Sequence, residues 1–135
     1  MDYVFDACAI IAFLNDEPGA ETVTELLSQA RAGTNHLFMS SIQALEIYYD
    51  RIYVMGRDYA DNFLKSLFAF PVAILPEITS DIIREAGLFK TSYSISLADS
   101  IAAATAKILD AALVTKDDEI KPAEEAGEFS VLWLK

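Results

Sequence analysis

Short apolar runs alternate along the chain with longer amphipathic segments, which is the pattern of strands separated by helices. In the segment 21–31, for example, Val23, Leu26, Leu27 and Ala30 recur at helical spacing. Glycine and proline separate the segments. The pattern predicts strands at residues 3–5, 36–39, 72–75, 112–114 and 131–134, and helices at 7–14, 21–31, 41 to about 55, 57–70, 79–91, 96–109 and 122–126.

Strands that alternate with helices and are almost continuously apolar favour a parallel sheet covered by helices on both faces. We therefore expect an α/β fold, and the 135 residues fit one domain spanning 1–135. In such sheets the functional crevice lies beyond the carboxyl ends of the strands. Asp6 and Asp117 follow the first and fourth expected strands, so both should lie at that edge.

The net charge of −11, from 21 acids and 10 bases, argues against an ordinary nucleic-acid-binding module. The negative charge is still compatible with an enzyme that binds phosphates through metal ions. No apolar stretch approaches the roughly 20 residues of a bilayer span, so no membrane partner is expected. The start of the chain is not a secretory signal and Cys8 is the only cysteine, which together predict a cytoplasmic protein.

Two acids follow expected strands, and each has a plain structural alternative. Asp6 lies between a strand and a helix, where Asp is also a favoured N-cap. Asp117 belongs to an acidic run with Asp118 and Glu119, and such runs are usually solvated turns. Each acid alone is weak evidence, whereas their shared edge of the sheet favours a common site.

Two further acids lie within expected helices. Glu46 shares its helix face with aromatic residues, so its carboxylate either is buried or forms an exposed stripe with Asp50. Asp99 has the spacing of a capping box with Ser96. Its helix face is otherwise lined by alanines, which predicts that the Asp99 carboxylate points into the fold.

Carboxylates that converge repel one another and persist only with shifted pKa values or a bound cation. Oxygen ligands suit Mg²⁺, with Mn²⁺ as the second possibility, and such a metal activates water to hydrolyse a phosphodiester. The residues that other sites require are missing. His36 is the only histidine, which argues against a zinc site or a histidine-based catalytic triad, and no glycine-rich phosphate loop occurs. Cys8 is expected to be a small core residue and not a nucleophile.

Five segments, in this order and spacing, cover almost the whole chain: 4–9 (VFDACA), 17–21 (EPGAE), 40–49 (SSIQALEIYY), 94–104 (SISLADSIAAA) and 113–117 (LVTKD). Together they resemble the PIN domain family and, within it, the VapC-like toxins of prokaryotic toxin–antitoxin pairs. The resemblance implies a three-layer α/β/α sandwich around a central parallel sheet of about five strands.

The resemblance also implies a magnesium-dependent endoribonuclease, in which Asp6, Glu46, Asp99 and Asp117 are the catalytic, metal-binding acids. Thr115 would support them, and Lys116 is the base beside a proposed ligand. Such toxins cut RNA, form homodimers and are silenced by a cognate antitoxin whose tail crosses the active-site groove. Any exposed aromatics among Tyr48, Tyr49, Tyr53, Tyr59 and Phe63 would serve these contacts. Core packing explains most of these side chains, since Tyr59 and Phe63 lie on the predicted buried side of the helix at 57–70.

The chain departs from the family pattern directly after the first acid. The family usually carries a hydroxyl residue and then a serine there, whereas this chain has Ala7 and Cys8. We therefore expect a hydrogen bond to the Asp6 carboxylate to be weakened or lost. The alternatives are a catalytically weak or inactive PIN domain that binds a partner protein and, less favoured, a receiver-like signalling domain, which normally has paired acids where Asp6 stands alone.

Overall fold

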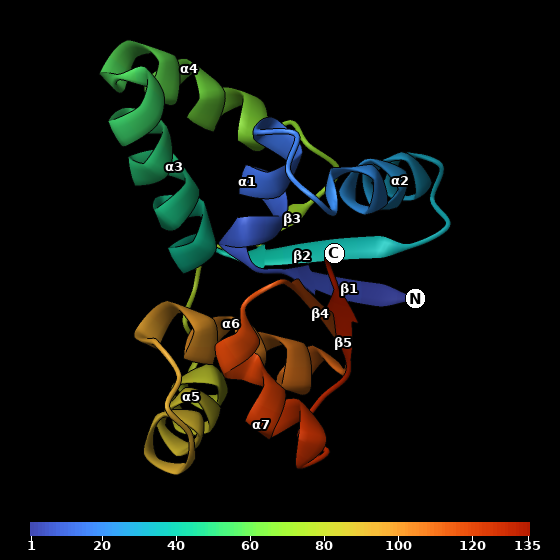
Figure 1. Ribbon diagram of the computed structural model, residues 1–135, viewed down its shortest axis with the longest axis vertical. Helices are drawn as coiled ribbons and strands as arrows, with labels where there is room; N and C mark the ends of the chain where they lie inside the picture. Colours follow the sequence, from blue (N-terminus) through green and yellow to red (C-terminus); the bar gives the residue numbers. More distant parts are fainter.

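The computed structural model describes all of residues 1–135 and has a five-stranded parallel sheet between two layers of helices (Figure 1). The strands are β1 (Asp2–Phe5), β2 (His36–Ser40), β3 (Ala73–Leu75), β4 (Ala112–Thr115) and β5 (Val131–Trp133). The helices are α1 (Ala7–Leu14), α2 (Ala20–Arg31), α3 (Ser41–Met55), α4 (Arg57–Leu67), α5 (Ser80–Ser92), α6 (Leu97–Leu109), the 3₁₀ turn η1 (Asp118–Ile120) and α7 (Lys121–Glu125).

The strand order β3-β2-β1-β4-β5 creates a switch point at the centre of the sheet. The chain runs outward from β1 through β2 to β3 and then returns to pair β4 with the other side of β1. The connections on the two sides of β1 therefore diverge at the carboxyl ends of β1 and β4. In open α/β sheets this divergence leaves a crevice.

Successive side chains of the central strands point alternately into two separate hydrophobic cores. Val4 and Leu113 face the layer of α5, α6 and α7, whereas Phe5 and Val114 face the layer of α1 to α4. In Figure 1 the α3–α4 pair extends beyond the edge of the sheet. None of the helices combines the length and apolar character required to cross a membrane.

The predicted α/β/α fold with a central parallel sheet is confirmed, and the differences lie at element ends. The helix predicted at 57–70 ends at Leu67, because the chain turns there and Pro71 disfavours helix in the residue before it. Phe63 is buried against α1–α4 core residues, as predicted. Tyr59, predicted on the same side of that helix, is exposed, as are Tyr49 and Tyr53, and Tyr48 is half-buried.

Gly19, which precedes α2, allows the last residues of the chain to approach closely. Its φ is +98°, and a Cβ placed there would lie 2.7 Å from the Cβ of Leu134. Leu134 in turn donates its backbone N–H to the Thr115 carbonyl at 2.9 Å, at the end of β4. An L side chain at position 19 would therefore meet both backbone strain and a clash.

We predict that Gly19→Ala lowers the free energy of unfolding by about 1–3 kcal/mol. Gly87→Ala is the matched control, because Gly87 lies in α5 with open space around its Cβ position. That change should raise the free energy of unfolding by about 0.5–1 kcal/mol. Urea denaturation of the two variants measures both effects, and a neutral Gly19→Ala would contradict the close approach.

Candidate active site

A pocket of about 280 Å³ lies beyond the carboxyl ends of β1 and β4. Carboxylates from separate elements line it: Asp6 follows β1, Glu46 comes from α3, Asp99 from α6 and Asp117 from the segment after β4. The structure thus places the four acids singled out in the sequence around one cavity. Glu17, Asp50 and Lys116 line the same pocket, and Lys116 is its only basic lining residue.

Asp6 is both an N-cap and a wall of the pocket. Its Oδ1 accepts from the backbone N–H of Ala7 at 2.8 Å, as expected for a residue that starts α1. Its Oδ2 accepts from the Thr115 hydroxyl at 2.9 Å and from the Cys8 thiol at 3.5 Å. The hydrogen bond that was expected to be weakened or lost is therefore kept as a long thiol contact from Cys8, and β4 supplies a hydroxyl through Thr115.

Cys8 lines the pocket, so its interpretation as a plain core residue is also wrong. Burial, followed by the charge of Asp6, raises the pKa of the Cys8 thiol to about 12. A thiol with this pKa stays protonated at neutral pH and is not a nucleophile. The protonated thiol can donate to Asp6, which makes it a further support for that carboxylate.

The fully buried Thr115 hydroxyl orients two of the acids. Besides donating to Asp6, its Oγ1 accepts from the backbone N–H of Asp117 at 3.1 Å. Asp117 Oδ1 then accepts from the backbone N–H of Glu119 at 3.3 Å, which caps η1. Asp118 is outside the pocket and pairs with Lys121 at 3.2 Å.

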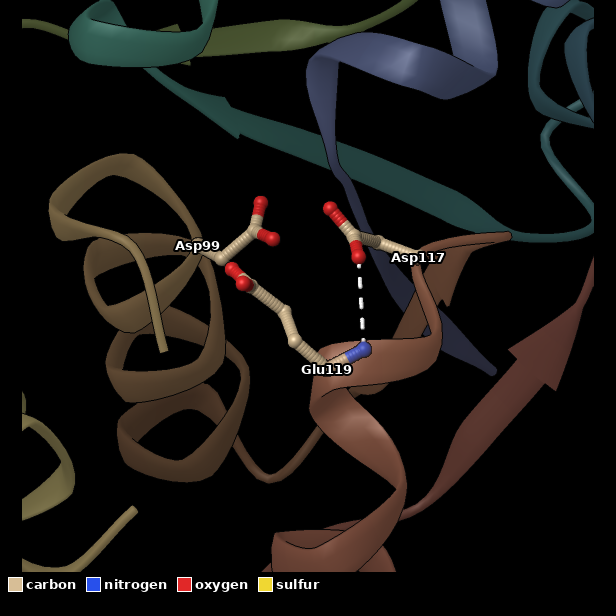
Figure 2. A group of neighbouring side chains, drawn as sticks. All are labelled: Asp99, Asp117 and Glu119. Carbon is tan, nitrogen blue, oxygen red and sulfur yellow. Dashed lines mark hydrogen bonds between the residues drawn. The ribbon is translucent and has the colours of Figure 1, made fainter. Parts of the chain in front are cut away.

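Asp99 is the most deeply enclosed acid of the group after Asp6, with 5% of its surface exposed. Its backbone N–H donates to Ser96 Oγ at 3.2 Å, so one half of the expected capping box is present. Its carboxylate does not complete the box. It faces Asp117 and Glu119 (Figure 2), and one ligand atom from each of these three residues lies within 4.8 Å of the others.

Glu119 was not singled out by the sequence reasoning. The only local signal was its place two residues after Asp117 in the acidic run. Its contact with Asp99 depends on the packing of η1 against the start of α6, which periodicity does not reveal.

Three carboxyl groups of the pocket, those of Asp6, Glu46 and Asp99, have raised pKa values. Burial is the main cause at Asp6 and at Asp99, where the charge of Asp6 adds to the effect. Burial and then the charge of Asp6 raise the pKa of Glu46 to about 7. Glu119 has a lowered pKa, because it accepts a hydrogen bond from Asp99. Part of the cluster therefore holds protons when no cation is bound.

The donor set fits a hard divalent cation. All candidate ligands are carboxylate oxygens, and the buried Asp99 Oδ2 has no hydrogen-bond partner. The nearby bases do not neutralise the cluster, because Lys116 pairs with Glu17 and Arg51 pairs with Asp50 at 2.7 Å.

Comparison with known proteins shows the same fold in toxin–antitoxin complexes. VapBC2 from Rickettsia felis, solved bound to a DNA fragment from its promoter, has a TM-score of 0.78 at 18% identity over 100% of both chains. VapBC-1 from nontypeable Haemophilus influenzae has a TM-score of 0.74 at 21% identity over 98% of each chain. VapBC-5 from Mycobacterium tuberculosis has a TM-score of 0.64 at 14% identity over 98% of each chain.

No match to the chain is found among curated proteins. The sequence model of the family described as PIN domain, however, matches residues 3–125, which is nearly the full length. This match also removes the receiver-like alternative. The chain belongs to the PIN domain family.

Proposed function

We propose that the protein is a magnesium-dependent endoribonuclease and the toxin of a VapBC-type toxin–antitoxin pair. The observation that carries the proposal is the pocket in which Asp6, Glu46, Asp99 and Asp117 meet, with the buried Asp99 Oδ2 unpartnered. Membership of the PIN domain family and structural neighbours that are VapBC complexes support it.

The carboxylates of Asp6, Glu46, Asp99 and Asp117 would hold Mg²⁺, which when bound activates water and neutralises charge on a phosphodiester. Glu46, whose pKa is raised to about 7 in the metal-free protein, would lose its proton when Mg²⁺ binds. Thr115 keeps Asp6 and Asp117 in place by hydrogen bonds to both.

Lys116 is the residue best placed to meet a phosphate of the RNA. Its ammonium pairs with Glu17 at the rim of the pocket, and both side chains are 35% exposed. A partly exposed pair of this kind exchanges partners at small cost. RNA phosphate would therefore displace Glu17 from Lys116.

An antitoxin and a second copy of the chain are the proposed protein partners. Large apolar side chains are exposed along α3, along α4 and at the residue that follows α4, and such a surface suits a protein partner: Leu45, Tyr49, Tyr53, Val54, Met55, Tyr59 and Phe68. Tyr49 also lines the acidic pocket, so one partner can cover the apolar surface and the acids together. An antitoxin tail that combines apolar and basic residues would fit both the apolar surface and the acidic pocket.

The alternative of an inactive PIN domain rested on Ala7 and Cys8. Thr115 and the Cys8 thiol both donate to Asp6, which supports a first carboxylate that is held in place although Ala7 supplies no hydroxyl. We therefore retain the active enzyme as the proposal.

The direct test is RNA cleavage with and without magnesium. Asp6→Asn and Asp99→Asn should each lower the rate at least about 100-fold, because each removes a charged ligand. EDTA should abolish cleavage and added Mg²⁺ should restore it. Asp118→Asn, outside the pocket, serves as the matched control and should cut at nearly the wild-type rate. Cleavage that survives EDTA would refute the metal-dependent mechanism.

The pH dependence of stability gives a second prediction. Raised carboxyl pKa values mean that the metal-free folded state holds more protons than the unfolded state, so its stability falls as pH rises. For Glu46 this loss runs from its ordinary value of 4.5 to about 7. Bound Mg²⁺ offsets the repulsion, so the upward shift in Tm with millimolar Mg²⁺ should grow between about pH 5 and about pH 8.

Asp99→Asn is the matched variant for this measurement. The neutral amide should raise the Tm of the metal-free protein by a few degrees at the upper end of that pH range and remove most of the Mg²⁺-induced shift. Thermal melting with and without Mg²⁺ measures both. Equal Mg²⁺ shifts in the wild-type protein and Asp99→Asn would exclude this pocket as the metal site.

Lys116→Ala should weaken the binding of different RNAs by similar factors, because a phosphate contact carries no base information. Glu17→Gln should strengthen binding, since it frees Lys116. With one such contact, the slope of log K against log salt should be no steeper than about −1.5. Fluorescence anisotropy with RNAs blocked against cleavage tests this, and a steep slope would reveal a basic surface formed elsewhere.

A further inference from the structure

We infer that Glu119 is a positioning residue: it caps the N-terminus of α6 from outside that helix, so the Asp99 carboxylate faces the pocket and does not turn back onto its own helix. The inference rests on the proposed metal-dependent function, for which it assigns a residue outside the four acids.

A capping box normally joins two residues of the same helix. The N-cap hydroxyl accepts from the N–H three residues on, and the acidic side chain at that third residue accepts from the N-cap N–H. In α6 the first bond is present, from Asp99 N–H to Ser96 Oγ at 3.2 Å. The second is made by a different residue, since the Ser96 N–H donates to Glu119 Oε1 at 2.8 Å.

Because Glu119 and not Asp99 accepts from the Ser96 N–H, the Asp99 carboxylate can point away from its own helix. If Ser96 N–H had no other acceptor, the Asp99 side chain would be the nearest acid able to satisfy it, and the carboxylate would turn back onto its own helix. Glu119 already accepts the hydrogen bond of the Ser96 N–H. The Asp99 carboxylate instead faces Asp117 (Figure 2), and its Oδ2 is buried without a partner.

The same contact fixes the distance between two of the acids. Glu119 N–H donates to Asp117 Oδ1 at 3.3 Å while its side chain holds Ser96, so one residue connects the fourth acid to the start of the helix that carries the third. From the opposite side, the fully buried Gln43 of α3 donates to the Ala98 carbonyl at 2.8 Å. The first turn of α6 is therefore held between η1 and α3.

The test compares Glu119→Ala with Glu119→Gln, because glutamine keeps an acceptor oxygen but loses the charge. Hydrogen exchange at the Ser96 amide reports the cap directly, and the half-saturating Mg²⁺ concentration, measured by calorimetric titration, reports the site without RNA. Glu125→Ala changes an exposed acid on α7 and is the matched control for lost charge.

In Glu119→Ala we expect faster exchange at Ser96 and a half-saturating Mg²⁺ concentration about 10-fold higher. Glu119→Gln should restore both to near the wild-type values, and Glu125→Ala should leave both unchanged. If Glu119→Gln protects Ser96 but binds Mg²⁺ as weakly as Glu119→Ala, Glu119 acts through its charge and the positioning role is refuted. Unchanged Mg²⁺ binding in Glu119→Ala refutes it as well.

RNA cleavage by the same proteins separates this inference from the proposed function. If the Mg²⁺ pattern holds while the wild-type protein cuts no RNA, the positioning role stands and the endoribonuclease proposal fails. If the wild-type protein cuts RNA with Mg²⁺ and Glu119→Ala matches it in both Mg²⁺ binding and rate, only the positioning role fails.

Discussion

The confinement of several carboxylates in one partly buried pocket is the constraint on which the rest of the site depends. Asp6 and Asp99 are almost fully enclosed, and the nearby bases, Lys116 and Arg51, are engaged by other acids. Such a cluster is costly when every member is ionised, so without a cation it holds protons at raised pKa values. A divalent cation that replaces those protons would explain the arrangement. It would also give a partner to Asp99 Oδ2, which is buried without a hydrogen bond.

Three of these carboxylates are oriented by their positions at the starts of helices. Asp6 caps α1, Asp117 caps η1 and Asp99 lies in the first turn of α6. A cap has a fixed side-chain direction, and the N-terminus of a helix favours negative charge, so the same geometry that begins each helix also stabilises its acid. The structural and functional interpretations of these residues are therefore compatible. Because β1 and β4 are neighbours at the switch point, two of these helix starts meet there.

Sequence patterns were sufficient for the α/β fold and for the expectation that Asp6 and Asp117 share one edge of the sheet, since both follow directly from strand–helix alternation. They were insufficient for contacts between distant residues. The bond from Thr115 to Asp6 joins positions 109 apart, and the one from Ser96 to Glu119 depends on how η1 packs on α6. Cys8 and Tyr59 were misjudged for the same reason: local hydrophobicity shows that a side chain is partly buried, but not which neighbours surround it.

If a divalent cation replaces protons on the acids of this pocket, Asp99 must ionise when the metal binds. The ¹³C NMR shift of the Asp99 carboxyl carbon measures this change directly, because that shift distinguishes a carboxylic acid from a carboxylate. At neutral pH we expect a protonated Asp99 in the metal-free protein and an ionised Asp99 after Mg²⁺ is added. An Asp99 that is already ionised without metal, or that stays protonated in saturating Mg²⁺, would contradict the account.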